Sequence, residues 1–411
     1  MSKPDFVIII YPSDCDLIAS SDSVLHRRAV FLKQMANINI RDSFTIPAGH
    51  NESEKEFKVE YSGHVIQDSN YQDRLFGIKS LISHLVETDF KLLAEKHHYP
   101  KILNDVVWRE VLDAIKLKYE DISFFCILDG HGGQKTVDFI VTFGYVLLAQ
   151  YLSKFDESTD FGAYLSLFTT FIHETYKQVL LSDPEVVNYH DGSTCVFLLI
   201  DHKSTTVYTA SVGDSLVMLN NIQQIAHSCD NIDTNLEKSF KENNTLYGTM
   251  YAYTYDLEAA RNRTRIGIGG YRMYHSIGDY AEDMDVFNAL QNYQSGNKES
   301  YPLIHKFMNL KDPDRFCKFP NDHLMGRKPN VMLRNIKRNM MGSSAKVMKM
   351  GLGETKWVSL ASDGYSFYSI DDHRRTFHKD GPLSSESEDD RSIFTVHIEE
   401  GMKAKKKAKS E

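Results

Sequence analysis

Residues 122–133 read ISFFCILDGHGG, an apolar run that ends abruptly in a polar, glycine-rich turn. The run has the length of a buried strand, and it is too short for a helix of the usual length. A strand of this kind delivers Asp129 and His131 to the edge of a sheet. The stretch therefore predicts a sheet whose edge carries chemically active side chains.

Further strands surround this one in the sequence. Residues 193–219 read as three consecutive strands, broken by turns at 202–204 and 213–214. Strands that are joined by such short turns must be antiparallel. An alternating pattern begins at residue 57, and residues 355–364 and 392–400 add two more strands.

Four segments have the apolar spacing of helices. They are residues 78–96, 103–119, 134–154 and 160–182. In the second segment the apolar side chains at helical spacing are predicted to be core contacts rather than a binding stripe; these are Trp108, Val111, Leu112 and Ile115. Helices and antiparallel strands together predict an α+β fold.

Composition narrows the class of protein. The chain has 411 residues, of which 42% are hydrophobic, and a formal net charge of -9, so the folded part is not expected to bind nucleic acid. Five cysteines lack metal-ligand or disulfide spacing, and Cys126 and Cys195 lie in apolar runs where a buried thiol is expected. No apolar segment approaches spanning length, so we expect a protein of the cytoplasm or the nucleus that does not enter a membrane.

The chain divides into three parts. Residues 1–56 are predicted to be an N-terminal extension, and residues 57–400 one domain with an insertion at about 281–328. Residues 401–411 form a basic tail. It is either a disordered end, or it serves in nuclear import or in binding to an anionic surface.

Aspartates stand at the ends of several predicted strands. Asp129 and Asp363 each follow an apolar strand, and Asp389 or Asp390 precedes the last one. Two carboxylates about 4 Å apart repel by about 4 kcal/mol at an effective dielectric constant of about 20, so gathering them requires a cation. Oxygen ligands favour Mg²⁺ or Mn²⁺. A single Asp-Gly pair after a strand would more simply be a turn.

The motifs in order resemble those of the metal-dependent protein serine/threonine phosphatases of the type 2C family. The turn at 129–133 matches the family's DGHGG, and the similarity extends from about residue 57 to 399. The other matching strings are Gly192-Ser193-Thr194, Gly213-Asp214-Ser215, Ser276-Ile277-Gly278-Asp279 and Ala361-Ser362-Asp363-Gly364.

The resemblance implies a central β-sandwich of two mainly antiparallel sheets flanked by helices, in α-β-β-α layers. It implies hydrolysis of phosphoserine and phosphothreonine in proteins by metal-activated water, with one or two Mg²⁺ or Mn²⁺ ions. His131 would be the general acid that protonates the leaving alkoxide. The metal ligands implied are Asp129, the Gly130 carbonyl, Asp363, Asp389 and Asp214.

The chain departs from the family at its first motif. Gln72 stands where the family has a glutamate, and Asp68 stands near the place of a phosphate-binding arginine. Loss of a carboxylate weakens the second metal site, and loss of the arginine removes a bidentate phosphate contact. Arg74 is a nearby arginine that could replace it. The segment between Asp363 and Asp389 is also shorter than in the family.

Two functions therefore remain open. One is a working phosphatase, and the other is a pseudophosphatase scaffold that binds a partner without turnover. The expected partner is a phosphoprotein substrate or a signalling protein, and the chain is expected to be a monomer. An enzyme that forms an aspartyl phosphate on Asp129 fits poorly, because His131 stands where its second aspartate is expected.

Overall fold

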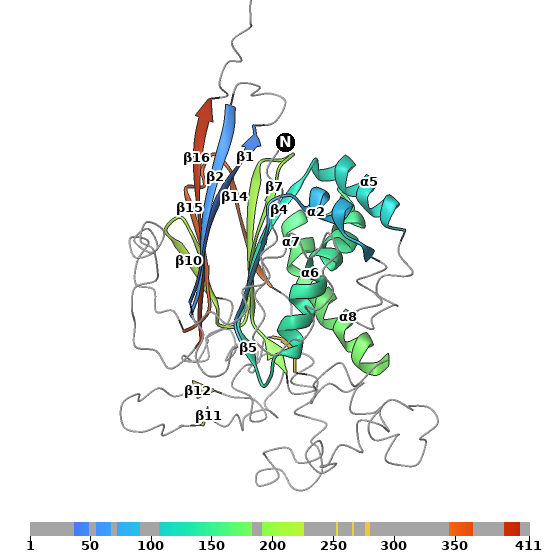
Figure 1. Cartoon of the computed structure of the whole chain (residues 1–411), viewed down its shortest axis with the longest axis vertical. Helices are drawn as coiled ribbons and strands as arrows, with labels where there is room; N and C mark the ends of the chain where they lie inside the picture. Colours follow the sequence, from blue (N-terminus) through green and yellow to red (C-terminus); the bar gives the residue numbers. More distant parts are fainter. Residues whose placement is uncertain are drawn as a thin grey trace, which may run out of the picture.

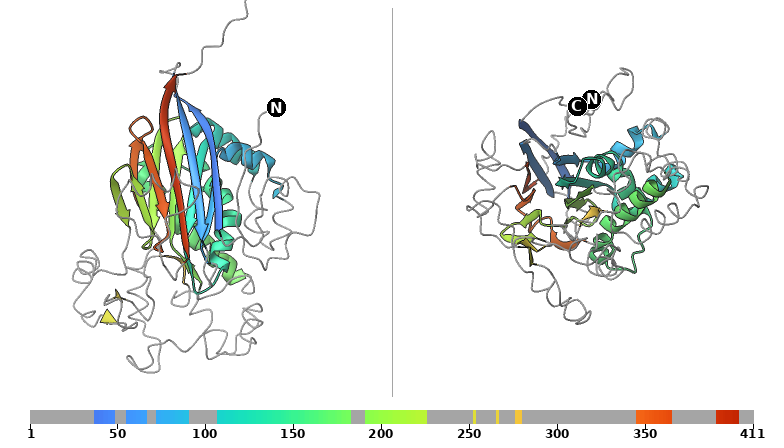
Figure 2. Two further views of the ribbon diagram at one scale, coloured as in Figure 1. Left: turned by 60° about the vertical axis from the view of Figure 1, so that its left-hand side comes forward. Right: turned by 90° about the horizontal axis from the view of Figure 1, so that it is seen from below.

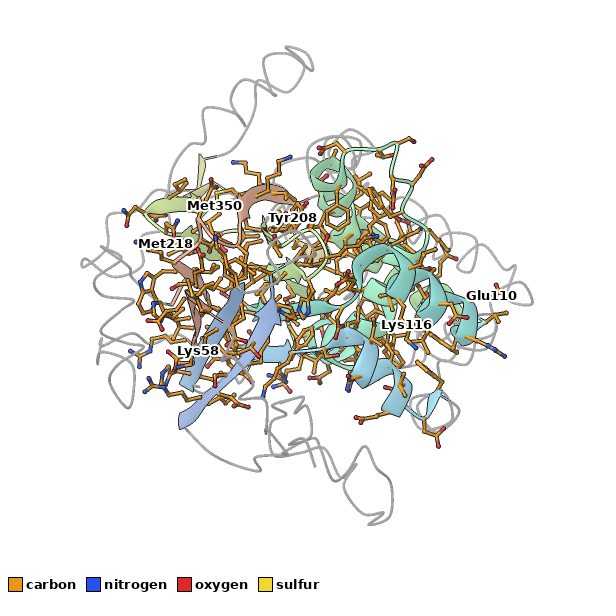
Figure 3. All side chains as sticks on the ribbon, turned by 90° about the horizontal axis from the view of Figure 1, so that it is seen from above. Lys58, Glu110, Lys116, Tyr208, Met218 and Met350 are labelled. Carbon is orange, nitrogen blue, oxygen red and sulfur yellow. The ribbon has the colours of Figure 1, made fainter. Side chains whose placement is uncertain are left out.

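The computed structural model describes residues 37–48, 55–66, 72–90, 107–182, 191–225, 252–253, 265–266, 276–279, 345–364 and 390–402. Two β-sheets face each other, and helices cover the outer face of one of them (Figure 1). Viewed from above, Lys58 on one sheet and Glu110 on a helix lie on opposite sides of this stack (Figure 3).

The sheet next to the helices has five antiparallel strands. Their order is β14 (Lys346–Gly351), β8 (Thr206–Val212), β7 (Cys195–Asp201), β4 (Ile122–Leu128) and β3 (Arg74–Ile78). Every residue of β4 is buried. The reason is that Phe124 and Cys126 face the helices while Phe125 and Ile127 face the other sheet. An apolar run at consecutive positions is therefore what this central strand requires.

The opposite sheet has six antiparallel strands and carries the other half of the sandwich core. Their order is β1 (Asn37–Pro47), β2 (Lys55–Ile66), β16 (Arg391–Met402), β15 (Trp357–Ala361), β9 (Leu216–Leu219) and β10 (Ile222–Ile225). Phe125 anchors the contact between the sheets, since its ring centroid lies 5.2 Å from that of Tyr61 and 4.8 Å from that of Phe394. In the left view of Figure 2 this sheet stands in front of the five-stranded sheet and the helices.

A small three-stranded sheet lies at the lower end of the sandwich in Figure 1. It has the order β13 (Ile277–Gly278), β6 (Gly192–Ser193) and β5 (Gly130–His131), all antiparallel. A further antiparallel pair is formed by β11 (Ala252–Tyr253) and β12 (Arg265–Ile266). The three-stranded sheet joins segments that are far apart in the sequence.

The described helices all lie on the side of the five-stranded sheet (Figure 1). They are α2 (Leu81–Glu87), α5 (Trp108–Tyr119), α6 (Lys135–Ser153), α7 (Phe161–Ser166) and α8 (Phe168–Ser182). Contrary to the expectation that no segment approaches spanning length, helix α6 is long and apolar enough to span a membrane. Most of it is buried in the core, as a central helix of a globular domain also is. Asp160 begins α7 by accepting a hydrogen bond from the Ala163 N–H (2.7 Å).

The predicted α+β fold with two mainly antiparallel sheets is confirmed. Val111 and Ile115 are buried core residues, and so are Cys126 and Cys195, as predicted. The described helices cover only one sheet, so the second helical layer of the α-β-β-α prediction is not seen within the ranges given above.

Three boundaries differ from the prediction. Of the predicted helix at 78–96, Ile78 is the last residue of β3, and the helix is the shorter α2, Leu81–Glu87. The sheet begins at Asn37, inside the segment 1–56 that was predicted to be an extension, because β1 pairs along its length with β2. The predicted helix at 160–182 is two helices, α7 and α8, separated at Leu167. The insertion at 281–328 and residues 403–411 lie outside the described residues.

Candidate active site

Three aspartates from three strand ends approach one another at one edge of the sandwich. Asp73 precedes β3, Asp363 follows β15, and Asp390 precedes β16; we call these three residues the aspartate cluster. The strands that carry the last two are joined where the Ser362 N–H donates to the Ser392 carbonyl (3.0 Å) and the Ser392 N–H donates to Ser362 Oγ (2.8 Å). Asp73 is completely buried and Asp390 is buried, whereas Asp363 is exposed.

The surroundings of the aspartate cluster are unfavourable to negative charge. The pKa of Asp73 is raised to about 8, mainly because burial disfavours its charged form. The neighbouring carboxylates of Asp390 and Asp363 raise it further, while hydrogen bonds with Ser362 and Ser392 lower it. A cation bound nearby would favour the charged form of Asp73 and so reverse this balance.

Gln72 joins the aspartate cluster to the turn at 129–133. Its N–H donates to Asp390 Oδ2 (2.5 Å). A Cβ added to Gly130 would lie 2.8 Å from the carbonyl oxygen of Gln72 and 3.3 Å from its Cβ. Only glycine fits against Gln72 in this way, so the glycine of the turn lets the two parts of the site meet.

The turn itself is held by the neighbouring motifs. The Asp129 carbonyl accepts hydrogen bonds from the Thr194 N–H (2.9 Å) and from Ser193 Oγ (3.2 Å). Thr194 Oγ1 in turn lies 2.6 Å from Ser215 Oγ, next to Asp214. Three stretches that were recognised separately in the sequence therefore form one connected structure around Asp129.

His131 lies against an aspartate from a distant segment. Its Nε2 is 2.8 Å from Asp279 Oδ2 and 3.0 Å from Asp279 Oδ1. Asp191 lies beside this pair, and burial raises its pKa to about 6, a shift opposed by the N–H of Lys135 that donates to its carboxylate. His131 is thus one member of a buried polar network, with about 30% of its own side chain exposed.

The metal ligands implied by the resemblance are only partly described. Asp129 and Gly130 are in the turn, Asp214 precedes Ser215, which contacts Thr194 beside the turn, and Asp363 belongs to the aspartate cluster. Asp389 and Asp68 lie outside the described residues, whereas Asp390, the alternative to Asp389, faces Gln72. Within the ranges that the structure describes, no group of three or more histidine, cysteine, aspartate or glutamate side chains is already arranged to hold a metal ion. The ligand assignments therefore stay predictions.

Arg74 does not take the place of the phosphate-binding arginine. Its side chain is completely buried, with Nη2 3.0 Å from Asp138 Oδ1 on α6, Nε donating to the same oxygen (3.1 Å) and Nη1 donating to the Asp73 carbonyl (2.9 Å). This ion pair fixes the start of β3 to the helix layer. The suggestion that Arg74 reaches a substrate phosphate is corrected accordingly.

Sequence reasoning missed three aspartates of this site. Asp73 directly follows Gln72 in the degraded motif and is the more deeply buried of the two, but its position in the motif did not indicate a role. Asp279 was recognised as the end of a motif but was given no role, and Asp191 was not noted. The only local signal for Asp279 and Asp191 is their place beside motif residues.

Comparison with known proteins supports the resemblance. The family model of protein phosphatase 2C matches residues 93–233, which include the turn at 129–133 and both neighbouring motifs. No curated protein sequence is similar enough to the chain to count as a match. The predicted resemblance to type 2C phosphatases is confirmed.

Three solved structures illustrate how distant the structural relatives are. A C. elegans sex determining protein is 15% identical over 89% of this chain and 65% of its own, with a TM-score of 0.43. Serine-threonine phosphatase 2C from Toxoplasma gondii is 10% identical over 88% of this chain and 99% of its own (TM-score 0.38). The phosphatase Stp1 from Staphylococcus aureus is 14% identical over 68% and 85% (TM-score 0.31). The chain thus spans less than two thirds, 65%, of the length of the first of these proteins.

Proposed function

Because residues 93–233 are similar to protein phosphatase 2C, we propose that this protein hydrolyses phosphoserine and phosphothreonine in other proteins with the help of Mg²⁺ or Mn²⁺. The observation that supports the proposal most is the junction at Gln72. There the aspartate cluster meets the turn that carries Asp129 and His131.

The roles of the side chains follow from their chemistry. Asp129, the Gly130 carbonyl, Asp363 and Asp390 or Asp389 offer the oxygen atoms that a hard divalent cation prefers, and Asp214 offers another. When bound, such a cation would supply Lewis acidity and a nucleophile at neutral pH. His131 would give its proton to the serine or threonine oxygen as the bond between phosphorus and that oxygen breaks.

A second function, that of a binding scaffold without turnover, is favoured by one observation. Gln72 lies between Asp390 and Gly130, where the family's glutamate would add a negative charge, so this position contributes no carboxylate to a cation. A weakened metal site would leave a fold that still presents the surface around the turn to a phosphoprotein or signalling partner.

Turnover of a phosphothreonine peptide at several Mn²⁺ and Mg²⁺ concentrations, and with chelator, distinguishes these functions. Asp129→Asn is the inactive variant, and Asp156→Asn, at an exposed position, is the matched control. We expect metal-dependent turnover that Asp129→Asn abolishes and Asp156→Asn preserves. A folded sample that shows no turnover at millimolar Mn²⁺ would refute the phosphatase and favour the scaffold.

The degraded motif can be tested by restoring it. The double variant Gln72→Glu, Asp68→Arg returns the carboxylate and the arginine of the family's pattern. We expect a lower Mn²⁺ concentration at half-maximal turnover than in the natural chain. An unchanged metal dependence would mean that position 72 does not contribute to the metal site.

The setting of the protein completes the proposal. It would act in the cytoplasm or the nucleus as a monomer, on a phosphoprotein and not on nucleic acid or a membrane. Light scattering after size-exclusion chromatography tests the oligomeric state, and a mass of twice 47.1 kDa would contradict it.

A further inference from the structure

The contact between His131 and Asp279 is formed by two segments that local sequence does not connect. His131 is in β5 and Asp279 follows β13, and both strands pair with β6, which lies between them. Both carboxylate oxygens of Asp279 lie within 3.0 Å of His131 Nε2. The carboxylate is almost completely buried, whereas the imidazole is partly exposed. The pair therefore has a buried support and an accessible ring.

Gly192 makes this contact possible. A Cβ at position 192 would collide with both His131 Nε2 and Asp279 Oδ2. The strand between the two residues can therefore carry no side chain at this point. The glycine of the Gly192-Ser193-Thr194 motif thus has a physical explanation that concerns His131 directly.

Asp279 is itself held in one conformation. Its φ of 56° is left-handed, which aspartate and asparagine adopt more easily than most residues. Its N–H donates to the Asp191 carbonyl (2.8 Å), and the Ser276 hydroxyl donates to Oδ2. Its carboxylate therefore has little freedom to turn away from His131.

Asp191 connects this support to helix α6. Its carbonyl accepts a hydrogen bond from Thr136 Oγ1 (3.1 Å), and its carboxylate accepts one from the Lys135 N–H (2.9 Å), at the first residue of the helix. The conformation of the segment 276–279 is thereby tied to the main core. A side chain anchored in this way can orient another with little loss of entropy.

We propose that Asp279 is a positioning residue for His131: its carboxylate accepts the Nε2–H of the imidazolium, so that the Nδ1–H is the proton given to the leaving oxygen of the substrate. The neutral ring that remains keeps its proton on Nε2. The inference rests on the proposed phosphatase activity. A carboxylate bound to one ring nitrogen fixes both the tautomer and the ring orientation of a histidine. Asp279 touches no reacting atom, so its effect would pass through His131.

Two variants separate orientation from folding. Asp279→Asn keeps the left-handed conformation and the approximate shape but removes the charge, and Asp279→Gly keeps the backbone and removes the side chain. Circular dichroism checks that both variants fold. Asp156→Asn is the control for loss of an exposed carboxylate.

The decisive measurement compares two substrates. A serine or threonine alkoxide leaves poorly and needs a proton from a general acid, whereas the nitrophenolate of p-nitrophenyl phosphate leaves without one. We expect both variants to lower kcat for a phosphothreonine peptide about tenfold or more, with little change in KM, because general acid catalysis contributes about 100-fold or more. The kcat for p-nitrophenyl phosphate should fall less than about threefold.

Equal losses on the two substrates, or no loss on either, would overturn the proposal. Nitrogen-15 NMR of histidine-labelled protein tests the contact without any turnover, with the His131 signals assigned through His131→Gln. We expect a single tautomer protonated at Nε2 in the natural chain and a mixture in Asp279→Gly. If wild-type turnover is absent the proposed function fails, and identical tautomer mixtures in the two proteins would then refute the contact separately.

Discussion

Replacing Asp73 by asparagine should make the metal-free protein more stable. Asp73 is completely buried, and its pKa is raised from 3.8 to about 8, mainly by burial and further by the charges of Asp390 and Asp363. Because the folded-state pKa is above the unfolded value, the group contributes stability that is fully present below pH 3.8. This contribution is lost progressively as the pH rises from 3.8 to about 8.

The magnitude follows from the size of this shift. One pH unit between the two pKa values is worth about 1.4 kcal/mol, so the carboxyl group costs about 4 kcal/mol at pH 7 relative to low pH. An amide of the same shape does not titrate and avoids this cost. The free energy of unfolding of Asp73→Asn, minus that of the natural chain, should grow by about 3 kcal/mol between pH 5 and pH 7.

Urea denaturation in the presence of chelator, at pH 5, 6 and 7, measures this difference. In a second series, Mn²⁺ should raise the free energy of unfolding of the natural chain more than that of Asp73→Asn. A bound cation stabilises the protein with more carboxylate oxygens, and the variant has lost one. A difference that is constant with pH would refute the electrostatic reasoning. An equal stabilisation of both proteins by Mn²⁺ would show that Asp73 does not sense the metal.

Three further changes test other parts of the structure. Burial raises the pKa of Asp191 to about 6, so its contribution to stability is present below about pH 4 and lost as the pH rises through 6; urea denaturation should show that Asp191→Asn removes a fall of about 3 kcal/mol across that range, and an unchanged slope would contradict this. Arg74→Met should lower stability by about 2–3 kcal/mol in thermal denaturation, because it leaves the partly buried Asp138 without its ion pair, and Arg74→Met with Asp138→Leu should recover most of the loss. Phe125→Ala should cost about 3–5 kcal/mol in urea denaturation by opening a cavity between the sheets, whereas Leu117→Ala, at a side chain that is 76% exposed, should cost less than about 0.5 kcal/mol; equal losses would show that the core is not where we place it.

The central strand could be predicted because its environment is the same on both sides. Residues 122–128 are apolar at consecutive positions since one face meets the helices and the other the second sheet. The same reasoning succeeded for α6, which is buried along most of its length. Where burial leaves one clear pattern, the amino acids alone are sufficient.

Other strands carry a weaker signal. In β1, Ile40, Phe44 and Ile46 alternate with polar residues, but the segment is separated from β2 by a polar stretch and was therefore assigned to an extension. Strand β3 begins with Arg74, which reads as a surface residue and is buried only because Asp138 of a distant helix pairs with it. Such strands depend on partners that sequence order does not reveal.

The candidate site shows the same division. The motif around Asp129 could be recognised because a strand, a turn and its glycines lie together in the sequence. The contact between His131 and Asp279 could not, since it depends on the pairing of β5, β6 and β13 and on the missing side chain of Gly192. Motifs therefore identified the segments of the site, while the folded chain determines which side chains meet.

The amide at position 72 links folding to the open question of activity. The backbone N–H of Gln72 donates to Asp390, and its backbone packs against Gly130. The residue therefore keeps the two halves of the site together whether or not its side chain is charged. A glutamate here would add a negative charge to a group in which the pKa of Asp73 is already raised. The glutamine therefore eases folding without a cation and weakens the attraction for one, and both effects have the same electrostatic origin. A weaker attraction of the site for a cation can be offset by a higher metal concentration, whereas a misplaced His131 cannot be offset in this way. The dependence of turnover on Mn²⁺ concentration therefore separates a weakened phosphatase from a scaffold.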